Sequence, residues 1–160
     1  MEQITVRDLR DADVEQLVAI AVAAWEPIYG HYRQQLGDEI FDMCYPNWDE
    51  EKSRQIRVAC ASKSVHVLVA TRNDKPVGFV TFVCDGKVGT IGNNAVHPSC
   101  QRQGIASRLY QQAFQRMREM GMKAARVNTG LDPSHAPARR AYEKAGFDRQ
   151  LPSVEYFCSL

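Results

Sequence analysis

The segment from Val88 to Met120 constrains the fold more than any other part of the chain. Val88 to Val96 is rich in β-branched and apolar residues, which predicts a strand. His97-Pro98 ends that strand, because proline has no N–H for a ladder and the residue before it avoids helical angles. Apolar residues then recur at helical spacing from about Gln103 to Met120, which predicts a long helix after a short loop. A strand that passes so quickly into a helix is typical of mixed α/β domains.

Two similar apolar runs precede this segment, at Val65–Thr71 and Val77–Cys84. Turn-forming residues lie between them, at Asn73 to Pro76, and Asp85-Gly86-Lys87 precedes the next strand. The three runs therefore predict an antiparallel meander. A further strand at Lys123–Thr129 follows the long helix, and a connection through a helix implies parallel pairing.

The remaining segments complete a single α/β domain over residues 1–160. We expect an opening strand at Gln3–Arg7 and a helix after it that Asp11 and Asp13 cap. Trp25 to Trp48 is rich in aromatic residues and is expected to be irregular, with helical patches. The other expected elements are helices at Asp49–Ala61 and Ala136–Ala145, the second ended by Gly146 as the long helix is ended by Gly121, and closing strands at Phe147 and Val154–Phe157.

Composition narrows the functional class. The 160 residues are 44% hydrophobic and carry a net charge of +1, without the basic excess that nucleic-acid binding or an anionic membrane surface favours. The five cysteines include no CxxC pair, so we expect free thiols and no metal site. We find no signal peptide and no apolar run of membrane-spanning length, and we expect a cytoplasmic protein.

The loop between the fourth strand and the long helix is a candidate phosphate site. The first turn of a helix has unpaired N–H groups and a positive dipole end, which suit an anion such as pyrophosphate. Gly104 and Ala106 are small where a phosphate must come close, and Arg102 and Arg108 add positive charge. The simpler alternative is that Gly104 only lets a loop enter a helix. Neither a Walker loop nor a GxGxxG fingerprint is present.

Two motifs carry a family resemblance. Gln101-Arg102-Gln103-Gly104-Ile105-Ala106 resembles the Gln/Arg-x-x-Gly-x-Gly/Ala motif of the Gcn5-related N-acetyltransferase (GNAT) superfamily. Residues 138–147 resemble its second motif, Ala-x-x-x-Tyr-x-x-x-Gly-Phe. The resemblance covers about residues 65–160, and Ala23 to Pro27 resembles a bacterial subset more loosely. It implies a central, mostly antiparallel, splayed sheet with helices on both faces, and an enzyme that transfers an acetyl group from acetyl-CoA directly to an amine.

The resemblance also implies where acetyl-CoA binds. The loop and helix-start amides would hold its pyrophosphate, and these belong to Arg102, Gln103, Gly104, Ile105 and Ala106. The pantetheine arm would lie between the strands at 91–96 and 123–129, paired with the backbone of Ala95 and Val96. A bulge near Asn93-Asn94 would suit this arrangement. His135 and Arg139 are further candidates for CoA contacts, although a helix-cap histidine and a solvated arginine are equally good interpretations.

The resemblance assigns the general acid to one residue but leaves the general base open. Tyr142 matches the family's general acid, the tyrosine before the Gly-Phe pair; the alternative is an aromatic that packs the helix onto the sheet. Many relatives place a glutamate base on the fourth strand, but the matching position here is Thr90 and the strand has no carboxylate. A water chain held by Asn93, Asn94 or Asn128, the carboxylate of Glu26, or an acceptor of low pKa would each remove the need for that glutamate.

The acceptor side is expected in the first third of the chain, which contains most of the aromatic residues together with Glu26, Asp38 and Glu39. These residues favour a small-molecule or peptide amine, and they also suit plain packing of helices onto the sheet. The main alternative function is a CoA-binding sensor without catalysis; a loop that binds nothing is the third. Relatives are often homodimers, and the predicted strand Val154–Phe157 is a candidate edge for one.

Overall fold

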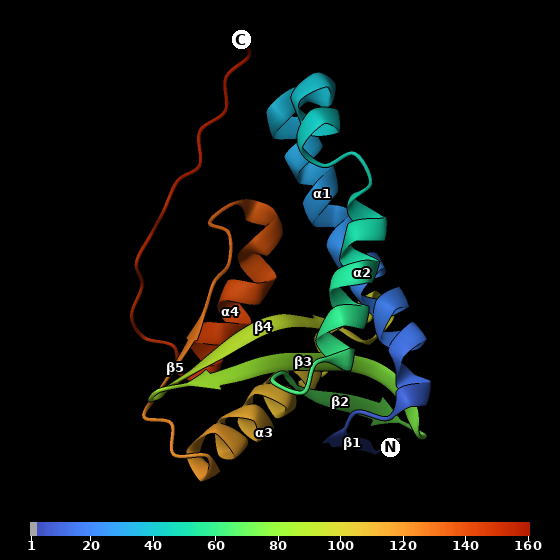
Figure 1. Ribbon diagram of the computed structural model, residues 1–160, viewed down its shortest axis with the longest axis vertical. Helices are drawn as coiled ribbons and strands as arrows, with labels where there is room; N and C mark the ends of the chain where they lie inside the picture. The colour runs from blue at the N-terminus through green and yellow to red at the C-terminus, as the bar shows by residue number, and fades with distance from the viewer. Residues whose placement is uncertain (1–2) are drawn as a thin grey trace.

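The computed structural model describes residues 3–160 (Figure 1). One five-stranded sheet runs through it in the order β1-β2-β3-β4-β5; the first four strands are antiparallel and β5 is parallel to β4. The strands are β1 (Ile4–Asp8), β2 (His66–Arg72), β3 (Lys75–Asp85), β4 (Val88–Val96) and β5 (Ala124–Val127). The helices are α1 (Val14–Cys44), α2 (Trp48–Ala61), α3 (Ile105–Glu119) and α4 (Ala136–Ala145), with short 3₁₀ turns η1 (Asp11–Asp13), η2 (Pro98–Cys100) and η3 (Pro133–His135).

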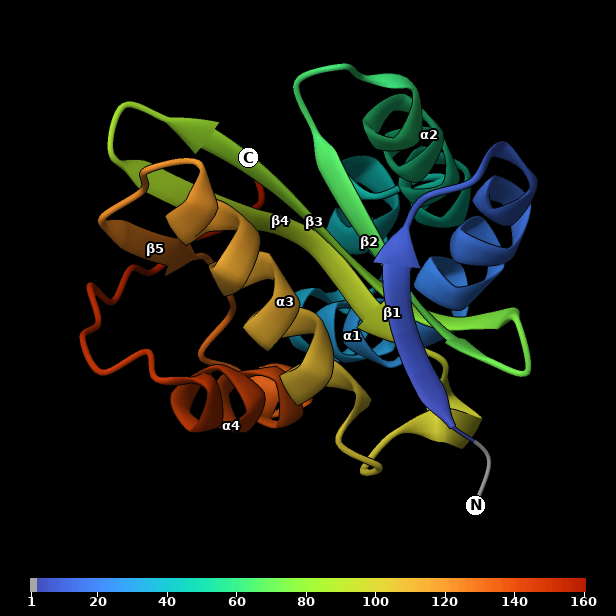
Figure 2. The ribbon, with the colours of Figure 1, turned by 90° about the horizontal axis from the view of Figure 1, so that it is seen from below.

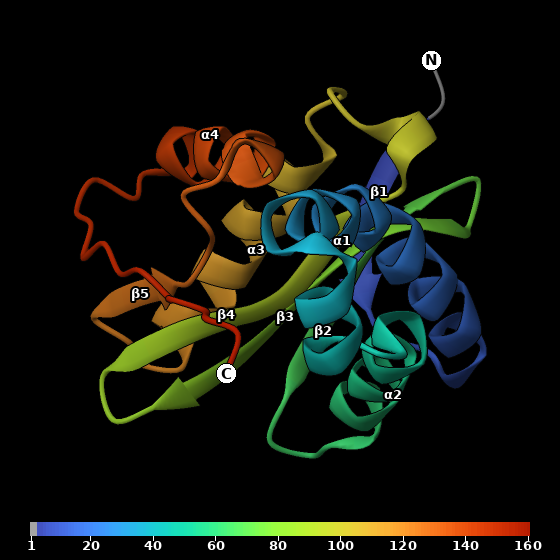
Figure 3. The same ribbon diagram turned by 90° about the horizontal axis from the view of Figure 1, so that it is seen from above.

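Helices cover both faces of the sheet, with α3 and α4 on one side and α1 and α2 on the other (Figures 2 and 3). Side chains of a strand alternate between faces, and β2 shows the result. Leu68 is buried in the core under α3, whereas its neighbour Val69 is buried in the core under α1 and α2. The predicted mixed α/β fold with a mostly antiparallel, two-sided sheet is therefore confirmed.

A bulge in β4 interrupts the pairing with β3. Val80 pairs with Asn94 and Phe82 pairs with Ile91, so that Gly92 and Asn93 together lie opposite Thr81. The bulge also marks the point where the sheet splays, because the β4–β5 pairing ends at Ile91 and Val127. Beyond it, residues 94–96 pair with β3 alone. The bulge expected near Asn93-Asn94 and the gap between the two parallel strands are both present.

The N-terminal third is more regular than we expected. Trp25 to Cys44 belongs to the helix α1, which leaves helical geometry only at Gly37, where φ is 76° and ψ is 161°. The expectation of an irregular segment was wrong because the aromatic residues lie along one side of α1 and pack against the start of α2. Asp13 does not cap α1 either; its carboxylate binds the Arg7 guanidinium at 2.6 Å and accepts the Arg10 N–H at 2.8 Å.

The closing strands are the other wrong prediction. Residues 147–160 form no helix or strand, so β5 pairs only with β4 and its outer edge has no strand beside it (Figure 1). The five cysteines are all free thiols. Within residues 3–160, no helix is both long and apolar enough to cross a lipid bilayer.

Candidate functional site

The loop before α3 has a backbone shaped for an anion. Arg102 and Gly104 have positive φ angles of 60° and 77°, and Gln103 between them does not. Alternation of this kind turns successive N–H groups toward one concave side, a nest that suits phosphate oxygens. Gly104 is also the N-cap of α3, so the unpaired N–H groups of the first helical turn adjoin the nest. Buried Ile105 anchors the turn in the core.

The space beside this loop is open. A Cβ built on Gly104 would meet no protein atom within 4 Å, and residues 101–104 are exposed. The side chain of Gln103 accepts a hydrogen bond from Arg72, and Arg108 donates to the carbonyl of Ile4 at 2.9 Å. The side chain of Arg108 is thus bound to β1. Arg102, by contrast, is exposed and lies in the loop itself. The loop residues fit a pyrophosphate: open amides, a positive helix end and an adjacent guanidinium.

The backbone N–H and C=O groups of Ala95 and Val96, the two residues expected to hold the pantetheine arm, point in opposite directions. The N–H of His97 donates to Val77 O at 2.9 Å, on the β3 side of β4. Because backbone groups alternate along a strand, those of Ala95, which pairs with Phe79, also point toward β3. Those of Val96 point to the splayed side, where its carbonyl accepts a bond from Gln101 Nε2 at 3.2 Å. The expected role of the Ala95 backbone is therefore corrected: Val96 faces the gap.

The hydroxyl of Tyr142 lies at the splay, on the α3–α4 side of the sheet. Asn94, just beyond the bulge, donates from Nδ2 to this hydroxyl at 3.0 Å, and Tyr110 donates to Asn94 Oδ1 at 2.8 Å. Tyr142 and Tyr110 are 6% and 3% exposed. Their rings are in tilted contact, with centroids 5.4 Å apart. β4, α3 and α4 therefore converge on a single amide.

Burial raises the pKa of Tyr142, although its hydrogen bonds with Asn94 and Tyr110 oppose the rise. Burial likewise raises the pKa of Tyr110. Both phenols are neutral at pH 7. Because Asn94 donates to Tyr142, the phenolic proton of Tyr142 can point elsewhere; its own contact to Asn94 Oδ1 is longer, at 3.4 Å. The arrangement presents a neutral acid whose oxygen is fixed and whose proton is available to a ligand.

The other predicted site residues are not gathered at Tyr142. His135 holds Asp132 at 2.6 Å through Nδ1, and Arg139 donates to the carbonyls of Gly130 and Asp132 at 2.7 and 2.8 Å. Both side chains thereby stabilise the conformation of the loop before α4. Glu26 is exposed on α1, and no hydrogen bond or ion pair connects it to Asn94 or Tyr142 within residues 3–160.

Aromatic rings from α1, from α2 and from the connection between them form a wall on the side of α1 and α2. We define the aromatic wall as Tyr29, Tyr32, Tyr45 and Trp48. Tyr29 stacks on Trp48 with centroids 4.4 Å apart, and Tyr32 lies 6.1 Å from the ring of His135. Burial, aided by the carboxylate of Asp132, raises the pKa of Tyr32 to about 12. A cavity of about 430 Å³ adjoins the wall and includes Glu50, Glu51 and Arg54 in its lining.

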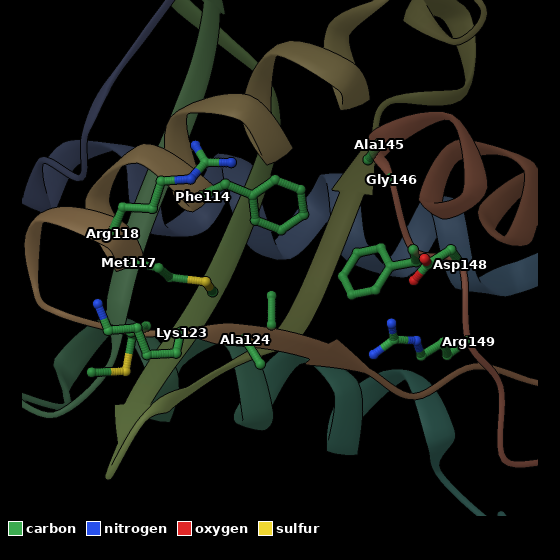
Figure 4. Close-up of a pocket in the computed structure, with 12 residues that line it drawn as sticks. Phe114, Met117, Arg118, Lys123, Ala124, Ala145, Gly146, Asp148 and Arg149 are labelled. Atoms are coloured by element: carbon green, nitrogen blue, oxygen red, sulfur yellow. The ribbon is translucent and has the colours of Figure 1, made fainter.

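A second cavity, of about 590 Å³, lies at the far end of α3 (Figure 4). Its lining includes the apolar side chains of Phe114, Met117, Ala124 and Phe147 and the charged side chains of Arg118, Lys123 and Arg149. It contains none of the predicted site residues. It borders the strand edge that the residues after α4 leave open. Within residues 3–160, no cluster of three or more His, Cys, Asp or Glu side chains is placed to hold a metal ion.

Sequence reasoning missed Tyr110 and Lys52. Tyr110 occupies an apolar position of α3 and resembles any core aromatic in the sequence. Lys52 is a buried cation on α2 whose Nζ contacts Asn93 Oδ1 at 3.3 Å. Nothing in the surrounding sequence distinguishes it from the solvated charges beside it, and only its contact with β4 reveals it.

Comparisons with known proteins agree with this geometry. The sequence profile of the Acetyltransferase (GNAT) family matches residues 25–147. A PaiA N-acetyltransferase from Thermoplasma acidophilum, solved with coenzyme A, has 19% identity and a TM-score of 0.74, with 92% of this chain and 91% of that chain covered. A transcriptional regulator from Bacillus halodurans C-125 has 21% identity and a TM-score of 0.68, with 98% and 100% covered.

Aminoglycoside N-acetyltransferase AAC(6')-Iy, solved with CoA, has 15% identity and a TM-score of 0.67, with 100% of this chain and 97% of that chain covered. No curated protein matches the chain. At these identities the solved structures establish the fold. The family profile spans the aromatic wall, the loop before α3 and the Asn94–Tyr142 pair together, and on that basis the chain belongs to the GNAT family of acetyl-CoA-dependent N-acetyltransferases.

Proposed function

We propose that this protein transfers an acetyl group from acetyl-CoA directly to the primary amine of a small molecule or peptide. The observation that carries the proposal is the buried hydroxyl of Tyr142, held by Asn94 at 3.0 Å where β4 and β5 separate. A buried phenol takes a hydrogen-bond partner in any core, so the informative feature is the position of this hydroxyl beside the opening in the sheet.

Cofactor binding would use the backbone of the loop and of β4. The nest at Arg102–Gly104 and the first turn of α3, including Ile105 and Ala106, would hold the pyrophosphate of CoA. The outward N–H and C=O of Val96 would orient the pantetheine arm in the gap. His135 and Arg139 would act indirectly, because their contacts fasten the loop before α4. Bound acetyl-CoA supplies an activated thioester.

In the transfer, the acceptor nitrogen forms a bond to the acetyl carbon, and the bond from that carbon to sulfur breaks. Tyr142 would give its proton to the departing sulfur, and Asn94 would hold the phenol in place for this. The amine must lose a proton too. Glu26 is exposed on α1 and makes no hydrogen bond or ion pair with Asn94 or Tyr142 within residues 3–160, and we propose instead that water at Asn94 and the bulge carries this proton to solvent.

The acceptor is proposed from the aromatic wall and its cavity. Some solved structures with this fold are aminoglycoside acetyltransferases, one of them in complex with sisomicin. Amines of small molecules are therefore the first compounds to screen, with peptide N-termini second. All five cysteines are free thiols, which favours a reducing compartment, and we propose the cytoplasm.

Thermal melting of the purified protein with CoA, acetyl-CoA, ATP and NAD in parallel tests the cofactor. A ligand that binds only the folded state raises the melting temperature. We expect a rise with the two CoA species alone, followed by release of free CoA thiol when amines are added. Stabilisation by CoA without turnover on any amine would instead indicate a CoA-binding sensor, and no stabilisation would contradict the cofactor assignment.

A further inference from the structure

Lys52 is a buried cation next to the bulge of β4. The residue is 6% exposed, and its Nζ lies 4.3 Å from the centre of the Trp25 ring. The ammonium donates to Gln55 Oε1 at 3.0 Å and to Asn93 Oδ1 at 3.3 Å. Asn93 thus contacts α2, whereas its neighbour Asn94 contacts Tyr110 and Tyr142 on the opposite face. The two asparagines connect the two sides of the sheet at one point.

No carboxylate neutralises this charge. Within residues 3–160 Lys52 makes no ion pair, and its hydrogen bonds are to neutral amide oxygens. The nearby carboxylate of Glu51 is exposed and bound to Arg54 at 2.6 Å. Burial lowers the pKa of Lys52, and Glu51 opposes that effect. A buried charge is stable in proteins when it is paired, so the site is electrostatically incomplete as it stands.

The hydrogen-bond donors of Lys52 and Asn93 are not all used within the protein. An ammonium has three N–H groups, and amide oxygens account for two of them here. The amide nitrogen of Asn93 has no acceptor among the described residues, because its oxygen makes the contact to Lys52. Gly92, next to it in the bulge, is exposed, so the bulge beside Asn93 lies at the surface of the protein. The Lys52 ammonium and the Asn93 amide are thus adjacent donors, one of them charged and covered on one side by Trp25, and the pair matches the two oxygens of a carboxylate.

The aromatic wall leads to this point. On α1, Trp25 lies one helical turn before Tyr29, and on α2, Lys52 lies one turn after Trp48. Tyr29 stacks on Trp48, and Trp25 covers Lys52. A molecule that lies along the wall therefore meets Lys52 and Asn93 at its inner end, one residue from the asparagine that holds Tyr142.

We propose that Lys52 and Asn93 bind a carboxylate of the acceptor, so that the preferred acceptors are amines that also carry a carboxylate, such as amino acids. This inference rests on the proposed acetyl transfer and specifies its substrate class. It sets this chain apart from enzymes whose acceptors carry only positive charge, because an unneutralised Lys52 repels them.

The test uses matched acceptor pairs, each an amino acid and the amine left by its decarboxylation: lysine and cadaverine, phenylalanine and phenethylamine, leucine and isoamylamine. We expect the wild type to favour the amino acid in at least one pair by about 10- to 100-fold in kcat/KM, the range of a charge-assisted hydrogen bond. Lys52→Met keeps the apolar stem and should bring the ratio within about 3-fold of unity, because the amino acid loses its charged partner and the plain amine is no longer repelled.

Two further variants sharpen the result. Asn93→Asp supplies Lys52 with an internal carboxylate and should also abolish the preference. Lys63→Met removes an exposed lysine of the α2–β2 loop and should leave it intact. Equal losses for both members of a pair in Lys52→Met, or a wild-type preference for the plain amines, would overturn the inference. Stabilisation by CoA with no acetylation of any pair would overturn it too, whereas absence of CoA binding would instead refute the proposed function.

Discussion

Single side chains at the splay define what this site can do. Asn94 contacts both Tyr110 and Tyr142, so its amide orients a phenol that burial keeps protonated at neutral pH. The adjacent Asn93 contacts Lys52 on the other face. In the proposed reaction the two consecutive asparagines therefore have different roles, Asn94 at the departing sulfur and Asn93 at the acceptor.

Replacing Tyr142 with phenylalanine tests the acid. We expect kcat to fall by about 100-fold or more, the usual range for loss of a general acid, with little change in KM for acetyl-CoA. Initial-rate kinetics measure both quantities, and the melting shift with CoA should persist. Tyr156→Phe, at a side chain that is 90% exposed, is the matched control. An unchanged kcat in Tyr142→Phe would return this residue to a packing role.

At the scale of elements, α3 has the proposed cofactor loop at its start and a second left-handed glycine after its end. Gly104 has φ 77° and Gly121 has φ 83°, and a Cβ at either position would have no protein atom within 4 Å. Any other residue is strained at both positions, but only Gly104 borders the proposed pyrophosphate site. Substitutions at Gly104 and Gly121 can therefore distinguish the effect of backbone strain from the effect of a lost ligand contact.

We predict that Gly104→Val raises KM for acetyl-CoA about 10-fold or more, because the side chain occupies the space where a phosphate must approach. Both variants should lose about 1–2 kcal/mol in the free energy of unfolding, because valine is strained at a left-handed backbone position. In Gly121→Val, however, KM for acetyl-CoA should stay near the wild-type value. Steady-state kinetics measure the KM values, and denaturant unfolding measures the stability. Equal KM values in the two variants would place the phosphates elsewhere.

The pair of Arg7 and Asp13 connects β1 to η1 and predicts a response to acid. The hydrogen bond with Arg7 holds the pKa of Asp13 below its ordinary value of 3.8, and burial opposes this effect. A carboxylate with a depressed pKa in the folded state stabilises the fold above its unfolded pKa, and that contribution is lost as pH falls through the folded value. Below about pH 4, the free energy of unfolding should therefore decline less steeply in Asp13→Asn than in the wild type. Urea denaturation between about pH 2 and 6 would show parallel curves if the pair contributed nothing.

At the scale of the whole molecule, the sheet is open at β5. This strand pairs only with β4, and the residues after α4 expose Leu151, Val154 and Tyr156. The unpaired edge and these exposed apolar side chains each favour association with a second chain. The homodimer suggested by the resemblance stays a prediction, and the open edge is the surface we assign to it.

Sedimentation equilibrium measures this directly. We expect the full chain to sediment as a dimer at micromolar concentration and a variant ending at Asp148 to sediment as a monomer. Replacing Leu151 and Val154 with serine should weaken the dimer while the circular dichroism spectrum is kept. A full chain that is monomeric at all concentrations would contradict the prediction.

Much of the fold followed from local patterns. The turn chemistry at Asp85–Lys87 and the helix-ending Gly121 and Gly146 predicted the boundaries of β4, α3 and α4 to within a few residues. These features depend on near neighbours in the chain, and backbone sterics apply to them wherever the segment lies. The long α1 was missed because its aromatic face is stabilised by α2, which the local sequence does not reveal.

By itself, the sequence determined the order of the elements from β2 to α4 and the glycine at the start of α3, because periodicity and allowed backbone angles act over a few residues. The two-sided sheet was expected from the family resemblance. The tertiary structure alone decided which side chains meet. Asn94 reaches Tyr142 across 48 positions, and Lys52 reaches Asn93 across 41. The bulge at Gly92-Asn93 alone decided that Val96 rather than Ala95 faces the gap. One extra residue in a strand reverses the direction of every group beyond it, and that depends on pairing with a partner strand.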